Sequence, residues 1–113
     1  MKVYLQAEKI FIANQAVDFR KSVDGLCAEV TKMQENPGEG IFIFYNRDHN
    51  RLKIIGRHIN GFMMIYKRLD RGKFFIVGSA DKISITRQQL EWLLLGVNWQ
   101  FLSKNNIKFQ TFL

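Results

Sequence analysis

The sequence contains five Asp residues of the kind that hydrolytic enzymes use to hold two metal ions for phosphodiester cleavage. Their positions predict a helix cap, a helix surface and three turns, rather than one shared site. They are Asp18, Asp24, Asp48, Asp70 and Asp81. We therefore expect no metal site, no cofactor and no catalytic residue among them.

The histidines and the single cysteine give the same expectation. His49 falls in a polar turn and His58 on a mostly apolar strand, nine residues apart and with no Cys or Glu at ligand spacing. Cys27 shares a helical phase with Val23 and Val30, which predicts a buried and unreactive thiol that has no disulfide partner in the chain. The prediction is a protein that is not an enzyme.

Basic residues give the clearest functional signal, because most of the formal net charge of +7 comes from one segment. Residues 46–73 hold eight Lys or Arg against two Asp, whereas residues 1–45 hold five against six acidic residues. A concentrated positive patch attracts polyanions and releases their counterions on contact. The segment is therefore a candidate for binding nucleic acid.

A β-hairpin is expected to display these charges, since Asn60-Gly61 is a strong signal for a two-residue turn. A turn at these two residues places Lys53 opposite Arg68 and puts the basic and aromatic side chains on one solvent face. The other face collects mostly apolar residues. A sheet with one solvated face would look similar, so a structural role for the charges stays open beside a functional one. The candidate nucleic-acid-binding residues are Arg20, Lys21, Arg47, Arg51, Lys53, Arg57, Tyr66, Arg68, Arg71 and Lys73.

The remaining elements predict an α+β fold. Apolar spacing predicts a helix over 19–34 that is capped by Asp18, and a capping-box pattern at Thr86 and Gln89 predicts a second over 87–95. The runs "GIFIFYN" and "KFFIV" predict a buried strand and a third strand after the hairpin. We expect one domain over 1–113, a meandering antiparallel sheet with a helix in each half, and a tail over 100–113 that is open to fraying.

Hydropathy gives an expectation about location. The sequence has no apolar run near the roughly 18 residues of a membrane span, and its first residues lack the pattern of a secretory signal. We expect a cytoplasmic protein with no membrane partner.

Several motifs resemble the small TnpB-type accessory proteins of insertion-sequence-66-type transposable elements. They are "IFIANQAVDFRKSVDGL", "IFIFYNRDHNRLKII", "NGFMMIYKRLDRGKF" and "ITRQQLEWLLLGVNW", in that order over roughly residues 10–99. The family pattern falls on Asp18, Arg20, Lys21, Asp24, Gly25, Leu26, Arg51, Leu52, Lys53, Asn60, Gly61, Lys67, Arg68, Leu69, Gly72 and Phe74. One departure is the stretch Gly56, Arg57, His58 and Ile59, where the family usually has aromatic residues followed by Asp.

The resemblance implies a role in transposition, in which a separate and larger protein carries the transposase catalytic domain. We expect a non-catalytic accessory protein that binds element DNA through the basic hairpin face. Other transposition proteins of the same element are expected partners, and the alternative is a protein-docking module that recruits or regulates the larger transposase, with the hairpin or the region of Trp92 and Trp99 as its anchor. Phosphate contacts weaken steeply with salt and an aromatic-anchored protein interface does not, so salt dependence distinguishes them.

Overall fold

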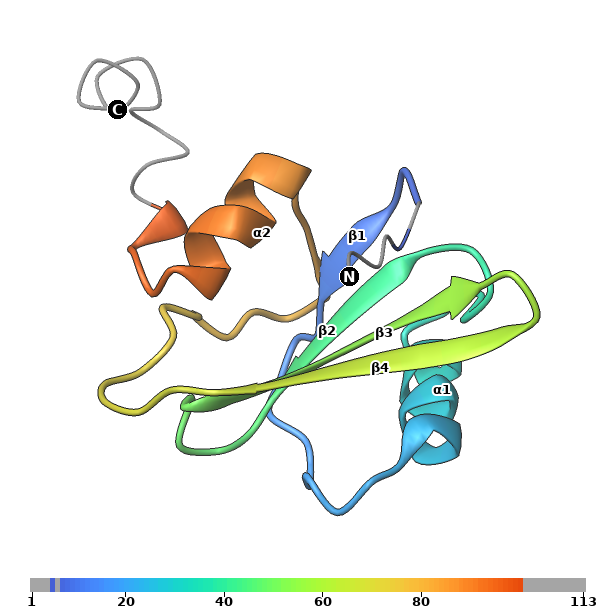
Figure 1. The fold of residues 1–113 in the computed structure, drawn as a ribbon, viewed down its shortest axis with the longest axis horizontal. Helices are drawn as coiled ribbons and strands as arrows, with labels where there is room; N and C mark the ends of the chain where they lie inside the picture. Colours follow the sequence, from blue (N-terminus) through green and yellow to red (C-terminus); the bar gives the residue numbers. More distant parts are fainter. Residues whose placement is uncertain (1–4, 6, 101–113) are drawn as a thin grey trace.

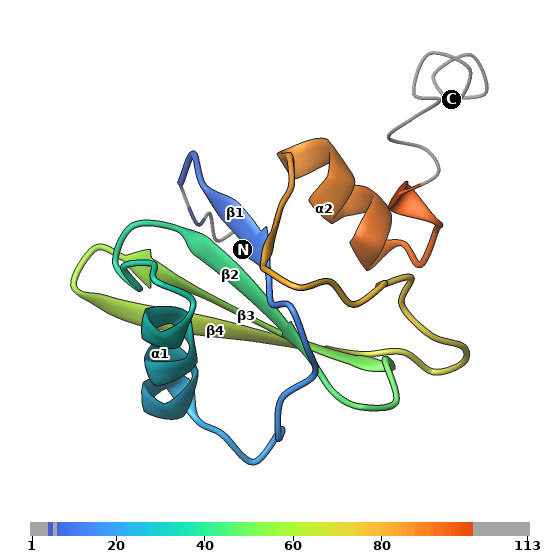
Figure 2. The same ribbon diagram turned by 180° about the vertical axis from the view of Figure 1, so that it is seen from behind.

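Five strands form one sheet that has a helix on each face, as Figures 1 and 2 show. The computed structural model describes residues 5 and 7–100, and the predicted tail lies almost wholly outside these residues. The elements are β1 (Ile10–Ile12), α1 (Val23–Lys32), β2 (Ile41–Tyr45), β3 (Arg51–His58), β4 (Gly61–Arg68), β5 (Ile83–Ser84) and α2 (Arg87–Leu94). The α+β prediction with a helix in each half is confirmed.

The strand order β4-β3-β2-β1-β5 is mostly antiparallel, with one exception that the sequence did not indicate. β1 pairs with β2 in parallel, Ile10 beside Ile41, because α1 connects them and returns the chain to the same end of the sheet. The short β5 then pairs antiparallel with the other side of β1.

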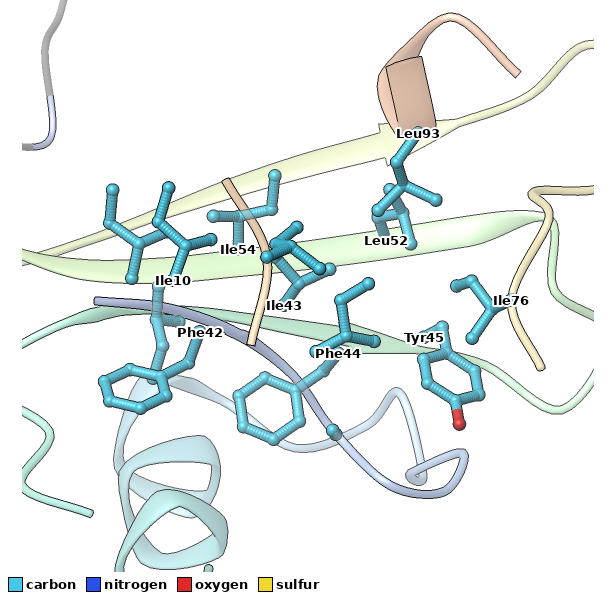
Figure 3. Close-up of a cluster of buried hydrophobic side chains, with 14 of the residues drawn as sticks. Ile10, Phe42, Ile43, Phe44, Tyr45, Leu52, Ile54, Ile76 and Leu93 are labelled. Carbon is cyan, nitrogen blue, oxygen red and sulfur yellow. The ribbon is translucent and has the colours of Figure 1, made fainter. Parts of the chain in front are cut away.

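The core lies on both faces of β2, whose five residues are all buried, as predicted. Phe42 and Phe44 point toward α1, whereas Leu52 lies on the other face, where Leu93 of α2 packs (Figure 3). Phe11 stacks on Phe42 with ring centroids 5.9 Å apart. This double burial fixes the faces of β3, which pairs with β2 over residues 52–56.

Helix α1 begins later than predicted, after Ser22 rather than after Asp18. The carboxylate of Asp18 instead accepts hydrogen bonds from the backbone N–H and the guanidinium of Arg20. The carbonyls of Phe19 and Lys21 accept hydrogen bonds from Lys53, so this stretch is held against the sheet in a non-helical conformation. The predicted cap at Asp18 is therefore wrong.

Helix α2 begins where the capping-box pattern of Thr86 and Gln89 predicted. Thr86 caps it, accepting a hydrogen bond from the backbone of Gln89 while the Gln89 side chain accepts one from the backbone of Thr86. Gly96 follows the helix with φ +79°, a conformation that glycine adopts without steric cost.

The run "KFFIV" does not form the predicted third strand. Phe74 and Ile76 are buried and Phe75 and Val77 are exposed, so side chains of this apolar run alternate between core and solvent. The segment nevertheless has no ladder partner among the described strands, and a single bond from the Phe74 N–H to the carbonyl of His49 ties it to the turn before β3.

The β3–β4 hairpin forms with a different turn from the predicted one. Ile59 and Asn60 are the two loop residues, and the pairing runs from His58 opposite Gly61 to Arg51 opposite Arg68. Lys53 therefore faces Tyr66 instead of Arg68, which removes a like-charge pair from the covered part of the sheet. Each residue of β3 pairs with a β4 residue two positions earlier than predicted. Because side chains alternate with a period of two, the same residues still share a face.

The new turn leaves Ile59 at φ +51°, an uncommon conformation for a β-branched residue, with its side chain 85% exposed. We expect Ile59→Asn to raise the free energy of unfolding by about 1 kcal/mol, because Asn tolerates positive φ and little packing is lost. Urea denaturation measures this. Ile59→Val, which keeps the branched Cβ, is the control and should give no gain; equal stability of Ile59→Asn and the wild type would contradict the prediction.

Candidate nucleic-acid interface

Two segments meet at one end of the sheet and bring basic residues together. The turn between β2 and β3 is joined to the loop after β4 by hydrogen bonds from the Leu69 N–H to the Asn50 carbonyl, 2.9 Å, and from the Phe74 N–H to the His49 carbonyl, 2.7 Å. We call the basic side chains of these two segments the basic cluster. Its members are Arg47, Arg51, Arg68, Arg71 and Lys73, all exposed except the half-buried Arg51.

The turn that carries Arg47 and Arg51 is internally braced. The side-chain oxygen of Asn46 accepts hydrogen bonds from the backbone N–H groups of Asn50 and Arg51, each at 3.0 Å, and its amide donates to the Asn50 side chain at 2.6 Å. The His49 ring also lies edge-on to Tyr45, with 5.0 Å between centroids. The backbone of such a turn loses little conformational freedom on binding a ligand.

Arg51 and Arg68 lie directly opposite each other across the two strands. Like charges in this position repel unless an anion lies between them. Arg51 Nε is shielded from water and has no hydrogen-bond partner among the described residues. A pair of guanidinium groups is suited to binding a phosphate, here through nitrogens other than the buried Arg51 Nε.

A cavity of about 550 Å³ lies beside Arg51. Its lining includes Arg47, but also Asp18 and Asp48. Asp18 is ionised at neutral pH and its charge is compensated by Arg20, since Arg20 Nη2 approaches its carboxylate at 2.6 Å and these contacts lower the pKa of Asp18 to about 2. At neutral pH this cavity is therefore mixed in charge, and the basic character comes from the residues around it.

The predicted exposure of Lys53 is wrong. Its side chain is 7% exposed, and Nζ donates to the carbonyls of Phe19 and Lys21 at 2.7 and 2.9 Å while lying 5.0 Å from the centre of the Phe19 ring. The segment before α1 covers this face and leaves carbonyl groups that need donors, and Lys53 supplies them. Lys53 is therefore a structural residue.

The other predicted residues divide into neighbours of the basic cluster and one distant residue. Arg20 is exposed beside Asp18, Lys21 Nζ lies 3.5 Å from Glu29, and Tyr66 is 48% exposed with its ring 6.2 Å from that of Phe19. Arg57 stands over Phe62 near the hairpin tip, roughly 20 Å along β3 from Arg51. The structure thus groups most, but not all, of the predicted site.

The tryptophans do not present the anchor that the docking alternative assumed. Trp92 is 4% exposed and Trp99 is 3% exposed, and both belong to the core. The exposed apolar residues on the described surface include Phe75, Val77 and Leu95, which sequence reasoning missed because each belongs to an apolar run that predicts burial. Cys27 is half-buried, and burial together with nearby Asp24 raises the pKa of its thiol.

Two further observations concern metals and membranes. Within residues 5 and 7–100, the structure places no group of three or more His, Cys, Asp or Glu side chains where they could bind one metal ion. Neither of the helices in the described part of the chain is long and apolar enough to cross a membrane.

Comparisons with known proteins give a consistent result. Residues 8–104 match the model of a protein family described as IS66 Orf2 like protein. The chain is 34% identical over 99 residues to the uncharacterized protein y4hO of Sinorhizobium fredii (strain NBRC 101917 / NGR234), covering 84% of this chain and 85% of that one. It is 29% identical over 103 residues to y4jC of the same strain, covering 88% of each. No solved structure matches the chain significantly.

Proposed function

The chain belongs to the IS66 Orf2-like family, whose members are associated with transposition, and from this premise we propose that it is a non-catalytic accessory protein that binds element DNA through the basic cluster. The observation that carries the proposal is the convergence of five basic side chains from two hydrogen-bonded segments, with Arg51 and Arg68 face to face. Two acidic residues in these segments, Asp48 and Asp70, leave a clear positive excess.

The chemistry of the cluster matches phosphate binding better than base reading. Four of its five members are Arg, whose planar guanidinium can bind two phosphate oxygens at once. The phenol ring of Tyr66 lies on the same face of β4 as Arg68 and is available for stacking on an unpaired base. Arg20 and Lys21 lie in the segment before α1 and are each paired with a carboxylate, Asp18 and Glu29, so they add little net positive charge. Arg57 and Lys53 are outside the proposed site.

Salt dependence tests the proposal directly. If Arg71 contacts a phosphate, Arg71→Gln should lower the slope of log affinity against log salt by about one unit. Arg57→Gln is the matched control, because Arg57 is also exposed but lies near the other end of the hairpin, and its slope should equal that of the wild type. Fluorescence anisotropy with element-end DNA at several salt concentrations measures both.

Two outcomes would contradict this function: no measurable DNA affinity of the wild type at low salt, or equal slopes for Arg71→Gln and the wild type. Docking to other transposition proteins of the element would then be the better proposal. The exposed side chains of Phe75, Val77 and Leu95 would be its first candidate surface.

A further inference from the structure

Strand β4 forms one edge of the sheet and exposes apolar side chains on both of its faces. Phe62, Met64 and Tyr66 lie on one face and are 36%, 37% and 48% exposed, and Ile65 on the other face is 41% exposed. Alternate residues of an edge strand also direct their N–H and C=O groups away from the sheet. The strand therefore offers both hydrogen-bonding groups and apolar surface to a further strand.

The usual protection against such pairing is missing from most of β4. Its ladder with β3 runs through eight consecutive pairs without a bulge, and residues 61–66 include neither Pro nor a charged residue. The two basic residues stand at the last positions, and Lys67 is turned away to donate a hydrogen bond to the carbonyl of Leu94 at 2.6 Å. α1 passes behind β4 in Figure 1 and in front of it in Figure 2, so the helix lies over the face rather than along the edge.

We propose that β4 is a dimerisation strand, which pairs antiparallel with β4 of a second copy of this chain about a two-fold axis at Ile65. A two-fold axis perpendicular to the joined sheet places the same face of both copies on the same side, so residues opposite each other share a face. The axis therefore lies between the two copies of a single residue. An axis at Ile65 pairs all seven residues from Phe62 to Arg68, and Ile65 faces its own copy.

The charge pattern of β4 favours a second copy in this orientation. Phe62 then faces Arg68 of the second copy and Met64 faces Tyr66 of the second copy, which are favourable cation–aromatic and sulfur–aromatic pairs. Lys67 faces Met63 of the second copy, so no like charges are opposed. A parallel arrangement would place Lys67 and Arg68 of the two copies side by side, which is destabilising.

One strand pair is small beside the interfaces of stable dimers, so we expect a dissociation constant in the micromolar range, on the order of 10 μM. The proposed interface consists of the edge backbone of β4, its apolar side chains and Arg68, and it shares Arg68 and Tyr66 with the proposed DNA-binding surface. Association is measured without DNA, so the test of the dimer does not depend on the proposed function. The proposed strand pairing joins the two five-stranded sheets into one sheet of ten strands in the dimer.

Sedimentation of the full-length protein over roughly 1 to 300 μM tests the proposal. Ile65→Lys places two ammonium groups opposite each other at the axis and should raise the dissociation constant at least tenfold. Val77→Lys is the matched control, because Val77 is 64% exposed and lies outside the sheet, and it should associate like the wild type. A wild type that stays monomeric at 300 μM, or equal association of Ile65→Lys and wild type, would overturn the proposal.

Cross-linking tests the register, with Cys27→Ser as the background. Opposed residues of antiparallel strands have Cα atoms roughly 4.5–5.5 Å apart, which permits a disulfide. Ile65→Cys should therefore form a covalent dimer under mild oxidation, whereas Val77→Cys should remain largely monomeric. Equal yields for the two variants would exclude an axis at Ile65, and correct folding of each variant is checked by circular dichroism.

Discussion

Lys53→Glu is expected to lower the free energy of unfolding by about 3–5 kcal/mol, although most charge reversals on a sheet surface have little effect. The substitution places a carboxylate beside two carbonyl oxygens and the face of Phe19, where the ammonium now donates two hydrogen bonds. The new charge would be 7% exposed or less and would have no donor. Since a domain of this size is stable by only about 5–15 kcal/mol, much of the protein would be unfolded at 37 °C.

Urea denaturation followed by circular dichroism measures this loss. Arg57→Glu is the control, since Arg57 lies on the same strand and the same face but is exposed, and it should change stability by less than about 1 kcal/mol. Lys53→Met keeps the length of the side chain and removes only the donors, so an intermediate loss of about 1–3 kcal/mol is expected. If Lys53→Glu were as stable as Arg57→Glu, the ammonium could not hold the segment before α1.

Arg68→Glu is expected to change stability and DNA affinity in opposite directions. The variant places a carboxylate opposite Arg51, which replaces repulsion with attraction and should raise the free energy of unfolding by roughly 0.5–1 kcal/mol. The same change puts a negative charge in the basic cluster and should weaken DNA binding by roughly 100-fold at low salt, about 2.7 kcal/mol.

The pair of measurements separates a binding site from a solvated surface. A site that keeps two Arg residues in repulsive positions for the sake of a ligand gains stability when that repulsion is removed and loses function. Arg57→Glu serves as the comparison for affinity, because it reverses one charge on the same face of the hairpin, where Arg57 faces Phe62 and lies outside the proposed site. Unchanged DNA affinity of Arg68→Glu would show that the cluster has no part in binding.

The features that could be predicted are those that depend on neighbours in the sequence. The capping box at Thr86 is a contact over three residues, and it forms as expected. Which residues share a face of the hairpin follows from the alternation of side chains, so this was correct even though the turn moved by one residue. Which face is solvated was not correct throughout, since Lys53 and Ile55 are buried and Ile65 is 41% exposed. The resemblance to the family rested on four local motifs, and the match over residues 8–104 agrees with it.

The features that could not be predicted depend on contacts between distant parts of the chain. Lys53 looked exposed because strand alternation cannot reveal that residues 34 and 32 positions earlier would cover it. The same contacts delayed the start of α1, since they compete with the helical hydrogen bonds of Phe19 and Lys21. In the basic cluster, the individual residues were predicted, but their grouping depends on the bonds from Leu69 and Phe74 to the turn before β3.

The strand order has a consequence for synthesis of the protein. Four neighbouring strands and α1 all come from residues 10–68, so this block can assemble while the rest of the chain is still being made. The face that carries Ile43 and Leu52 is completed only when Leu93 arrives, 25 residues after Arg68. At about 5–20 residues per second this takes roughly one to five seconds, to which transit through the ribosomal tunnel adds. During that interval the nascent chain displays an apolar sheet face together with the open edge of β4, the two kinds of surface that make folding intermediates prone to aggregation.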